Sequence, residues 1–294
     1  MPSNNVFKKL GGAFSRKSES AVTEESSPSL KEVSRVPGAE LSSRLDPWWW
    51  LVVAVAALLI LLLVWRTDPY WNILVFVRDG LVITIILTVV SFIFIILVGL
   101  IGGLGKISNN TVIRLVSSLY IEIVRGVPLL VQLIWWYFAA PVVIQTVGKW
   151  LHISALANYQ SNAIFLAIVG LVICYAAYMA EIFRAGIQSI HRGQMEAARS
   201  LGMSYLQAMR YIILPQAFRV VLPPVGNEFI MLLKDTSLVS VVAVADLTRR
   251  GREFMATHFN PIEVWTLIAL LYLIMTLVSA RFIAWLEKRR EVSG

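Results

Sequence analysis

The 294-residue sequence is poor in cysteine, histidine and charged residues. One cysteine, Cys174, and three histidines exclude a disulfide framework and a multi-cysteine metal site, and a metal site of any kind is not expected. Charged residues make up 15% of the chain, against roughly 25% in a typical soluble domain. In their place, 57% of the residues are hydrophobic and the mean hydropathy is +0.72. This composition is typical of a membrane protein.

Six long runs of the sequence are almost free of charge. A helix that spans a bilayer needs roughly 20 mainly apolar residues. Backbone polar groups in lipid must be bonded within the segment, which favours helices for runs of this length. The predicted spans are residues 48–65, 81–104, 128–147, 162–183, 212–233 and 262–285. The predicted fold class is an all-α integral membrane protein with about six transmembrane helices.

The basic residues indicate the orientation of these spans. Residues 1–46, 105–127 and 184–210 and the C-terminal end carry most of the Lys and Arg, so we expect them on the cytoplasmic side. Both termini would then be cytoplasmic. The cluster of Arg249, Arg250 and Arg252 is an exception, which we interpret as a docking surface for an external binding protein.

The N-terminal part divides into a polar tail and a hydrophobic segment. Residues 1–46 are rich in Ser, Glu, Lys and Pro, and we predict a disordered cytoplasmic tail. The apolar run begins too late for a signal peptide. Residues 47–66 are predicted to form a transmembrane helix with Trp48 and Trp65 at the two membrane boundaries. Residues 237–245 are apolar but too few to span, so we expect a re-entrant or interfacial piece.

A polar stretch, residues 184–211, separates the fourth and fifth spans. Good helix formers predict a short helix over residues 194–200, with Glu196 near its start where it favours the helix dipole. Gly202 can end that helix in a left-handed conformation. A second short helix is expected over residues 203–210, and Pro215 restricts the entry into the fifth span.

This stretch resembles the EAA loop of ATP-binding cassette (ABC) importer permeases. The family pattern is E-A-A, three residues, G, nine residues, I-x-L-P, and the sequence matches it at Glu196, Ala197, Ala198, Gly202, Ile212, Leu214 and Pro215. Residues 120–132, 180–187 and 222–240 are similar to the polar amino acid (histidine/glutamine/arginine-type) permeases. The resemblance covers residues 78–290. It implies a type I ABC importer permease core with one extra N-terminal helix.

The resemblance also implies a function, a location and partners. The chain would be the permease subunit of an amino acid importer in the plasma (cell inner) membrane. Expected partners are an ABC ATPase dimer, a second permease subunit in a homo- or heterodimer, an extracytoplasmic solute-binding protein, the amino acid and membrane lipid, with no nucleic acid. The loop would transmit closure of the ATPase to the membrane helices. The residues implied in this coupling are Glu196, Ala197, Ala198, Gly202 and Met203, with Ile212, Leu214 and Pro215 as structural motif residues.

The sequence gives no sign of an ATP site or of catalytic chemistry. A phosphate-binding loop ending in Gly105-Lys106 would need Gly at position 100 and Ser or Thr at 107, where the chain has Leu100 and Ile107. No nucleophile–base–acid constellation is evident. We therefore expect a translocation subunit that binds no cofactor, with ATP and Mg used by the partner ATPase.

Polar residues at membrane depth are the candidates for the substrate pathway, because such residues are costly unless they face protein or water. These are Asn227, Glu228, Lys234, Asp235, Thr236 and Ser237. An amino acid carries an ammonium and a carboxylate, so it needs both an acceptor and a donor. Pro223, Pro224 and Gly226 could break the fifth span and free its backbone for the ligand. For Lys234 and Asp235, the alternative is that they cap the span in the headgroup region.

Other functions are compatible with this composition. A permease for another small solute would have the same loop. An ion-coupled secondary transporter or a channel would need neither the loop nor an ATPase. A membrane-anchored scaffold could use the tail but would not need polar residues at membrane depth. The loop favours the importer.

Overall fold

The computed structural model describes residues 47–291, with side chains from Trp48 to Lys288. The predicted tail, residues 1–46, lies outside the described residues. Every regular element in the described part is helical, which confirms the predicted all-α class. The elements are α2 (Pro47–Trp65), α3 (Thr67–Lys106), α4 (Thr111–Gly126), α5 (Leu129–Ile134), η1 (Trp135–Ala139), α6 (Ala140–Trp150), α7 (Ser154–Ala157), α8 (Ala163–Gln188), α9 (Arg192–Ser200), α10 (Tyr205–Ala208), η2 (Met209–Ile213), α11 (Leu214–Asp235), η3 (Thr236–Val242), α12 (Leu247–His258) and α13 (Pro261–Glu291).

Five helical segments are long and apolar enough to cross a membrane. They are Trp48–Trp65, Thr67–Lys106, Leu129–Trp150, Ala163–Gln188 and Pro261–Lys288. The predicted fifth span corresponds to α11, whose 22 residues extend over about 33 Å, which matches a bilayer core of about 30 Å. Charged residues such as Arg219 and Glu228 lower its apolar character. α11 therefore has the length of a span and a more polar composition than the other five.

Two stretches that the sequence suggested as connections are helical. α3 begins at Thr67, well before the predicted start of its span at residue 81, and its early part includes Asp79, which forms an ion pair with Arg250. Residues 105–127, predicted as a loop, contain α4. Asn110 caps α4 by accepting hydrogen bonds from the N–H groups of Val112 and Ile113. Charged residues in these stretches suggested loops. In the structure these residues are part of helices, where their side chains are exposed or form ion pairs.

The predicted third span is interrupted by a wide π-helical turn, η1, between α5 and α6. α6 packs mainly against α7, and a Cβ on Gly148 would lie 2.3 Å from the backbone nitrogen of Ala157. The short 3-10 helix η3, followed by Ala243 with φ of 62°, occupies the segment predicted to be too short for a span.

Among the described residues, the most extensive helix packing is between α3 and α8. A Cβ on Gly99 would lie 2.6 Å from Cβ of Met179, and one on Gly103 would lie 2.7 Å from the carbonyl oxygen of Ala180. The order of these contacts shows that the two helices run parallel. Small residues allow this approach, which in membranes supplies the van der Waals contact that drives helix association.

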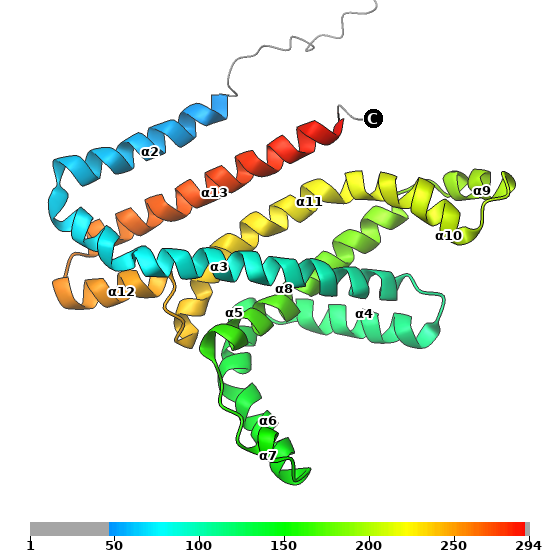
Figure 1. Ribbon diagram of the computed structural model, residues 1–294, viewed down its shortest axis with the longest axis horizontal. Helices are drawn as coiled ribbons and strands as arrows, with labels where there is room; N and C mark the ends of the chain where they lie inside the picture. Colours follow the sequence, from blue (N-terminus) through cyan, green and yellow to red (C-terminus); the bar gives the residue numbers. More distant parts are fainter. Residues whose placement is uncertain (1–46, 292–294) are drawn as a thin grey trace, which may run out of the picture. The chain divides into compact units, whose positions relative to one another are not determined.

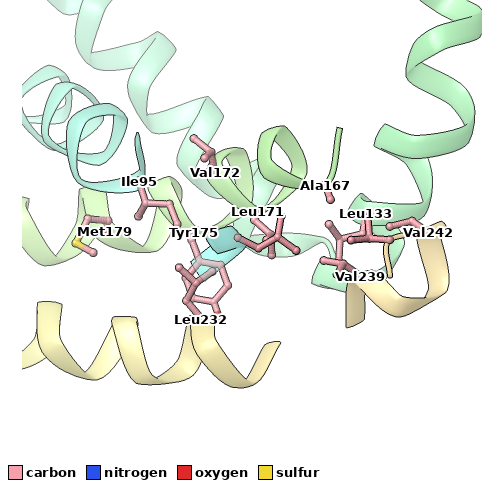
Figure 2. Close-up of a cluster of buried hydrophobic side chains, with 12 residues drawn as sticks. Ile95, Leu133, Ala167, Leu171, Val172, Tyr175, Met179, Leu232, Val239 and Val242 are labelled. Carbon is pink, nitrogen blue, oxygen red and sulfur yellow. The ribbon is translucent and has the colours of Figure 1, made fainter. Parts of the chain in front are cut away.

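The main core forms around this helix pair. Figure 2 shows Leu171, Tyr175 and Met179 on α8, with Tyr175 directed toward Leu232 of α11. Leu133 from α5 and Val239 and Val242 from η3 complete one end of the cluster. The core therefore joins α3, α8 and α11 to the start of the third span.

The extra N-terminal helix packs against the last one. α2 lies along α13 (Figure 1), and Leu59, Leu62 and Leu63 of α2 contact a second buried cluster from α3, α12 and α13. The guanidinium of Arg281 on α13 lies 5.5 Å from the ring centroid of Trp48. α2 is thus joined to the core through apolar contacts and one cation–π contact.

Two single-methyl substitutions test the α3–α8 packing. Gly103→Ala should lower the free energy of unfolding by about 1–3 kcal/mol, because the new Cβ meets backbone that cannot rotate away. Gly126→Ala is the matched control, since a Cβ there has nothing within 4 Å. Thermal melting of both variants in detergent should show a lower Tm for Gly103→Ala alone. Equal melting temperatures would contradict the packing.

Candidate functional site

The loop between α8 and α11 forms two short helices joined by a tight turn. α9 begins at Arg192 and ends at Ser200, and Gly202 follows with φ of +83°, in the left-handed region predicted for it. The Met203 N–H donates to the carbonyl of Ala198 at 3.1 Å, which closes the end of α9. Ser204 and Gln207 then form a capping box at the start of α10.

The two helices expose one set of side chains and bury another. Ala198 and Ala208 are buried, so their small side chains let the helices pack closely. Glu196 and Ala197 are exposed. Leu201 is 84% exposed and Leu206 77% exposed at the tip, an unusual amount for leucine. The loop, which Figure 1 shows projecting beyond α8 and α11, therefore exposes apolar side chains together with charged residues of both signs, Glu196, Arg192 and Arg199.

The rest of the predicted motif lies at the junction with α11. Ile212 is in η2, and Leu214 and Pro215 begin α11. Proline has no backbone N–H to donate, and Pro215 follows directly on the π-helical turn η2, where the regular α-helical hydrogen bonding is already interrupted. The second loop helix is shorter than predicted, because residues 209–213 form a π-helical turn that continues into α11.

Glu181, near the loop end of α8, forms ion pairs with three basic side chains. Its carboxylate lies 2.7 Å from Nζ of Lys106 and 3.7 Å from Nη1 of Arg125, and it pairs with Arg184. Arg184 is the only one of these partners that lies close to Glu181 in the sequence, three residues after it. Because Lys106 ends α3 and Arg125 lies on α4, this charge cluster ties three helices together close to the loop.

The predicted pathway residues lie on the last two turns of α11 and the start of η3. Asp235 accepts a hydrogen bond of 2.7 Å from the hydroxyl of Tyr175 on α8. Glu228 is half-buried, two turns earlier on α11. The hydrogen bond between Tyr175 and Asp235 thus joins the end of α11 to the middle of α8.

The remaining predicted pathway residues differ in exposure. Lys234 and Asn227 are exposed, and the amide of Asn227 contacts the sulfur of Met231 at 3.6 Å. Thr236 is buried, and its hydroxyl donates to the carbonyl of Leu233 at 2.7 Å, so it closes the end of α11. Ser237 is half-buried. Thr236 therefore has a structural partner, whereas Lys234 and Asn227 face outward. Pro223 and Pro224 lie within α11, which continues through them.

A polar residue that the sequence analysis missed lies at the break between α4 and α5. Gln132 is buried, and its amide donates to the carbonyls of Val124 and Val127 at 2.8 and 2.9 Å. It also contacts the sulfur of Cys174 at 3.5 Å. These bonds satisfy carbonyls that the helix break leaves open. The signal available in the sequence is Gly126-Val127-Pro128, a helix-stopping run followed by a polar residue at membrane depth.

The arginine cluster of α12 is bonded within the chain. Arg249 and Arg250 pair with Glu253 at 2.9 and 2.8 Å, and Arg250 also pairs with Asp79 on α3. The hydrogen bond from Arg249 lowers the pKa of Glu253. Arg252 donates to the hydroxyl of Ser240 on η3 at 2.6 Å. These partners give a structural reason for a basic cluster that the charge rule did not explain.

Asp246, also missed in the sequence, fixes the start of α12. Its carboxylate accepts from the N–H groups of Thr248 and Arg249 at 3.1 and 3.0 Å, and the side chain is buried. The next N–H, from Leu247, donates to the hydroxyl of Thr84 on α3 at 3.1 Å. Burial raises the pKa of Asp246 in spite of these bonds.

Among the described residues, no group of His, Cys, Asp and Glu side chains could hold a metal ion. The described polar groups near Asp235 offer hydrogen-bond donors and acceptors and a negative charge.

Comparison with known proteins places these features in a family. Residues 95–292 match the model of the "Binding-protein-dependent transport system inner membrane component". The glutamine transport system permease protein GlnP of Escherichia coli (strain K12) is 35% identical over 222 residues, 76% of this chain and 96% of its own length. The arginine transport system permease protein ArgU of Corynebacterium glutamicum is 39% identical over 209 residues, 71% of this chain and 66% of its own length.

Solved structures agree with this result. The crystal structure of an amino acid ABC transporter with histidines matches with a TM-score of 0.65 and 38% identity, over 76% of this chain and 97% of its own. An inward-facing form of the MetNI methionine ABC transporter matches with a TM-score of 0.59 and 22% identity, over 76% and 98% of the two chains. The latter shares the fold.

Two substitutions of Asp246 separate its capping role from its charge. Asp246→Ala should lower the free energy of unfolding by about 0.5–2 kcal/mol, because two helix N–H groups lose their acceptor. Asp246→Asn keeps an acceptor and should be tolerated. The pKa of Asp246 is raised in the folded protein. The contribution of this side chain to the free energy of unfolding is therefore greatest below the ordinary aspartate pKa, and it declines as the pH rises through the folded-state pKa. The stability of wild type relative to Asp246→Asn, measured by thermal melting, should therefore fall as pH increases, and a pH-independent difference would contradict the burial of this carboxylate.

Proposed function

Because the chain belongs to the family of binding-protein-dependent transport system inner membrane components, we propose that it is the permease subunit of an ABC importer for amino acids. It is a multi-pass membrane protein and a translocation subunit, not an ATPase. The amino acid substrate is proposed because GlnP and ArgU are named as glutamine and arginine permeases and because the polar residues on α11 suit a zwitterion.

The observation that carries the proposal is the geometry of the EAA loop. Glu196 and Ala197 are exposed on α9, and Leu201 and Leu206 are exposed at the tip, which is the arrangement of a docking surface. We propose that an ABC ATPase dimer, using ATP and Mg, binds Glu196 to Met203. A second permease subunit would complete the translocation path, and an extracytoplasmic solute-binding protein would deliver the amino acid. Both termini would lie in the cytoplasm.

Movement of the docked loop would reach the membrane helices through rigid connections. α9 follows α8 after three residues, and α8 is packed on α3 through Gly99 and Gly103. The cluster around Glu181 adds α4 to this unit. On the other side, η2 continues into α11. Closure of the ATPase dimer would therefore shift α8 and α11 together and open the permease to the other side.

The substrate is proposed to pass along α11. Glu228 and Asp235 would accept the ammonium group, with the hydroxyl of Tyr175 holding Asp235 in place. Asn227, Lys234 and Ser237 would offer donors to the carboxylate, whereas the hydroxyl of Thr236 is already bonded within the helix. An uncharged solute would not need these acids, so their effect on transport also tests the substrate class.

The importer is tested by ATP-dependent uptake into proteoliposomes that hold this chain with its ATPase and receptor. Glu196→Lys should lower uptake of a radiolabelled amino acid by about tenfold or more, because a like-charge or mismatched contact in a docking interface costs several kcal/mol. Binding of the receptor should be unchanged, since Glu196 is on the loop.

The matched control is Asp68→Lys, another exposed acid near the start of α3 and remote in sequence from the loop. It should leave uptake close to wild type. Uptake that needs no ATP would replace the importer with an ion-coupled transporter. ATP-driven uptake of a different solute would keep the permease and reject the amino acid.

The pathway is tested by Glu228→Gln and Asp235→Asn in the same assay. Each should raise the KM for uptake by about tenfold or more, since a hydrogen bond to a charged group contributes about 1.5–3 kcal/mol. Basal ATPase activity should persist, because neither residue lies in the docking loop.

Lys234→Gln tests whether Lys234 is part of the substrate pathway or caps the end of the span in the headgroup region. A raised KM places Lys234 in the pathway. Unchanged uptake identifies it as a residue of the helix end, and unchanged uptake in both acid variants would reject the pathway as a whole.

A further inference from the structure

An apolar cavity of about 660 Å³ lies between α3, α8, α11 and α13. Its walls include Phe92 of α3, Phe183 of α8, Leu222 and Val225 of α11, and Phe282 and Leu286 of α13. Its size is within the range of about 300–1,000 Å³ that small-molecule sites occupy. It adjoins the loop end of α11, where Leu214 contributes to the wall.

The walls of this cavity exclude polar occupants. All the lining residues are apolar side chains or glycine. A water molecule in such a cavity would lack the two to four polar partners that it needs. An amino acid would have to bury an ammonium and a carboxylate without partners, which is more costly still. The occupant must therefore be apolar where it contacts these walls.

None of the polar residues proposed for the pathway lines the cavity. The cavity wall on α11 extends from Leu214 to Phe229, whereas Lys234 and Asp235 lie at the far end of the helix. Glu228 is closer, because it is three residues from Val225 and about 60° from it around the helix axis. The cavity and the proposed pathway are therefore formed by different residues of α11.

Basic residues lie at the loop end of the cavity. Arg210, one turn before Leu214, is exposed, and so is Lys288, two residues after Leu286. In the sequence, residues 287–290 are Glu-Lys-Arg-Arg, so the end of α13 has a positive charge balance. Anionic lipid headgroups are attracted to such clusters next to membrane helices.

We propose that this cavity binds one acyl chain of an anionic phospholipid, with the headgroup near Arg210 and Lys288. Lipid tails are as apolar as leucine, so a tail gains little from leaving the bilayer. An empty cavity, however, would leave its lining without dispersion contacts, and a tail restores them. The headgroup then supplies the selectivity. The bound chain contacts α11 along the wall that extends from Leu214 to Phe229.

The test uses the full chain, assembled with its ATPase and reconstituted into liposomes with a phosphatidylglycerol that carries a photoactivatable group near the end of one acyl chain. After irradiation, peptide mapping should find the label on the cavity segments, residues 92–100, 217–229 and 282–286, above the level on the exposed α2 residues Val53 to Leu61. Val225→Trp fills the cavity and should reduce cavity labelling to the α2 level. Val220→Trp is the matched control on the exposed face of α11 and should label like wild type.

A competition experiment on the wild-type protein needs no variant that could misfold. Unlabelled phosphatidylglycerol should displace the label at a lower concentration than phosphatidylcholine, and Arg210→Gln or Lys288→Gln should each reduce this preference by about fivefold. Cavity labelling no higher than on α2, or equal labelling of the Val225→Trp and Val220→Trp variants, would overturn the proposal. Labelling of the cavity without any headgroup preference would overturn the claim that the bound lipid is anionic. None of these outcomes depends on transport, so they neither support nor contradict the proposal that the chain is an importer subunit.

Discussion

The close approach of α3 and α8 is the contact on which the other features depend. It exists because Gly99 and Gly103 leave room for the backbone of α8, and any Cβ at these positions would overlap with Met179 or Ala180. The parallel pairing places Glu181 within reach of Lys106 at the end of α3. It also directs Tyr175 toward α11, where it meets Asp235. In the proposed importer, this closely packed helix pair would move as one body, and the loop that follows α8 would then act on both helices.

Polar groups within the helices of this chain are bonded in ways that limit where the helices can lie. Thr84 and Thr88 on α3 donate to carbonyls one turn earlier, and Thr84 also accepts the N–H of Leu247. Gln132 bonds the open carbonyls at the α4–α5 break. In a low-dielectric interior each unpaired group would be costly, so these bonds select one arrangement of α3, α4 and α12. The pairs of Arg250 with Asp79 and of Arg252 with Ser240 extend the same constraint to η3.

Local patterns in the sequence predicted the loop well because its structure is set by neighbouring residues. Glycine at 202 has the left-handed conformation, Ser204 caps the next helix, and Pro215 is in the first turn of α11. Spans were predicted from apolar runs, which are also local. Contacts between distant residues could not be predicted: Glu181 with Lys106, Asp235 with Tyr175, and Asp79 with Arg250 join residues 60 to 171 positions apart. The same limit explains why Asp79 and Arg125 suggested connections, since their partners lie on other helices.

The composition of α11 follows from its two environments. One face carries Pro223, Asn227 and Lys234 in exposed positions, and the other lines an apolar cavity. A helix with charges on one face cannot be surrounded by lipid, so that face must meet water or protein. The apolar face has the opposite requirement, because only hydrocarbon or apolar side chains can contact it without a cost in free energy. The lower hydropathy of α11, compared with the five apolar spans, reflects these two environments. Because α11 continues directly from the EAA loop, motion of a docked partner in the proposed importer would reach this helix first.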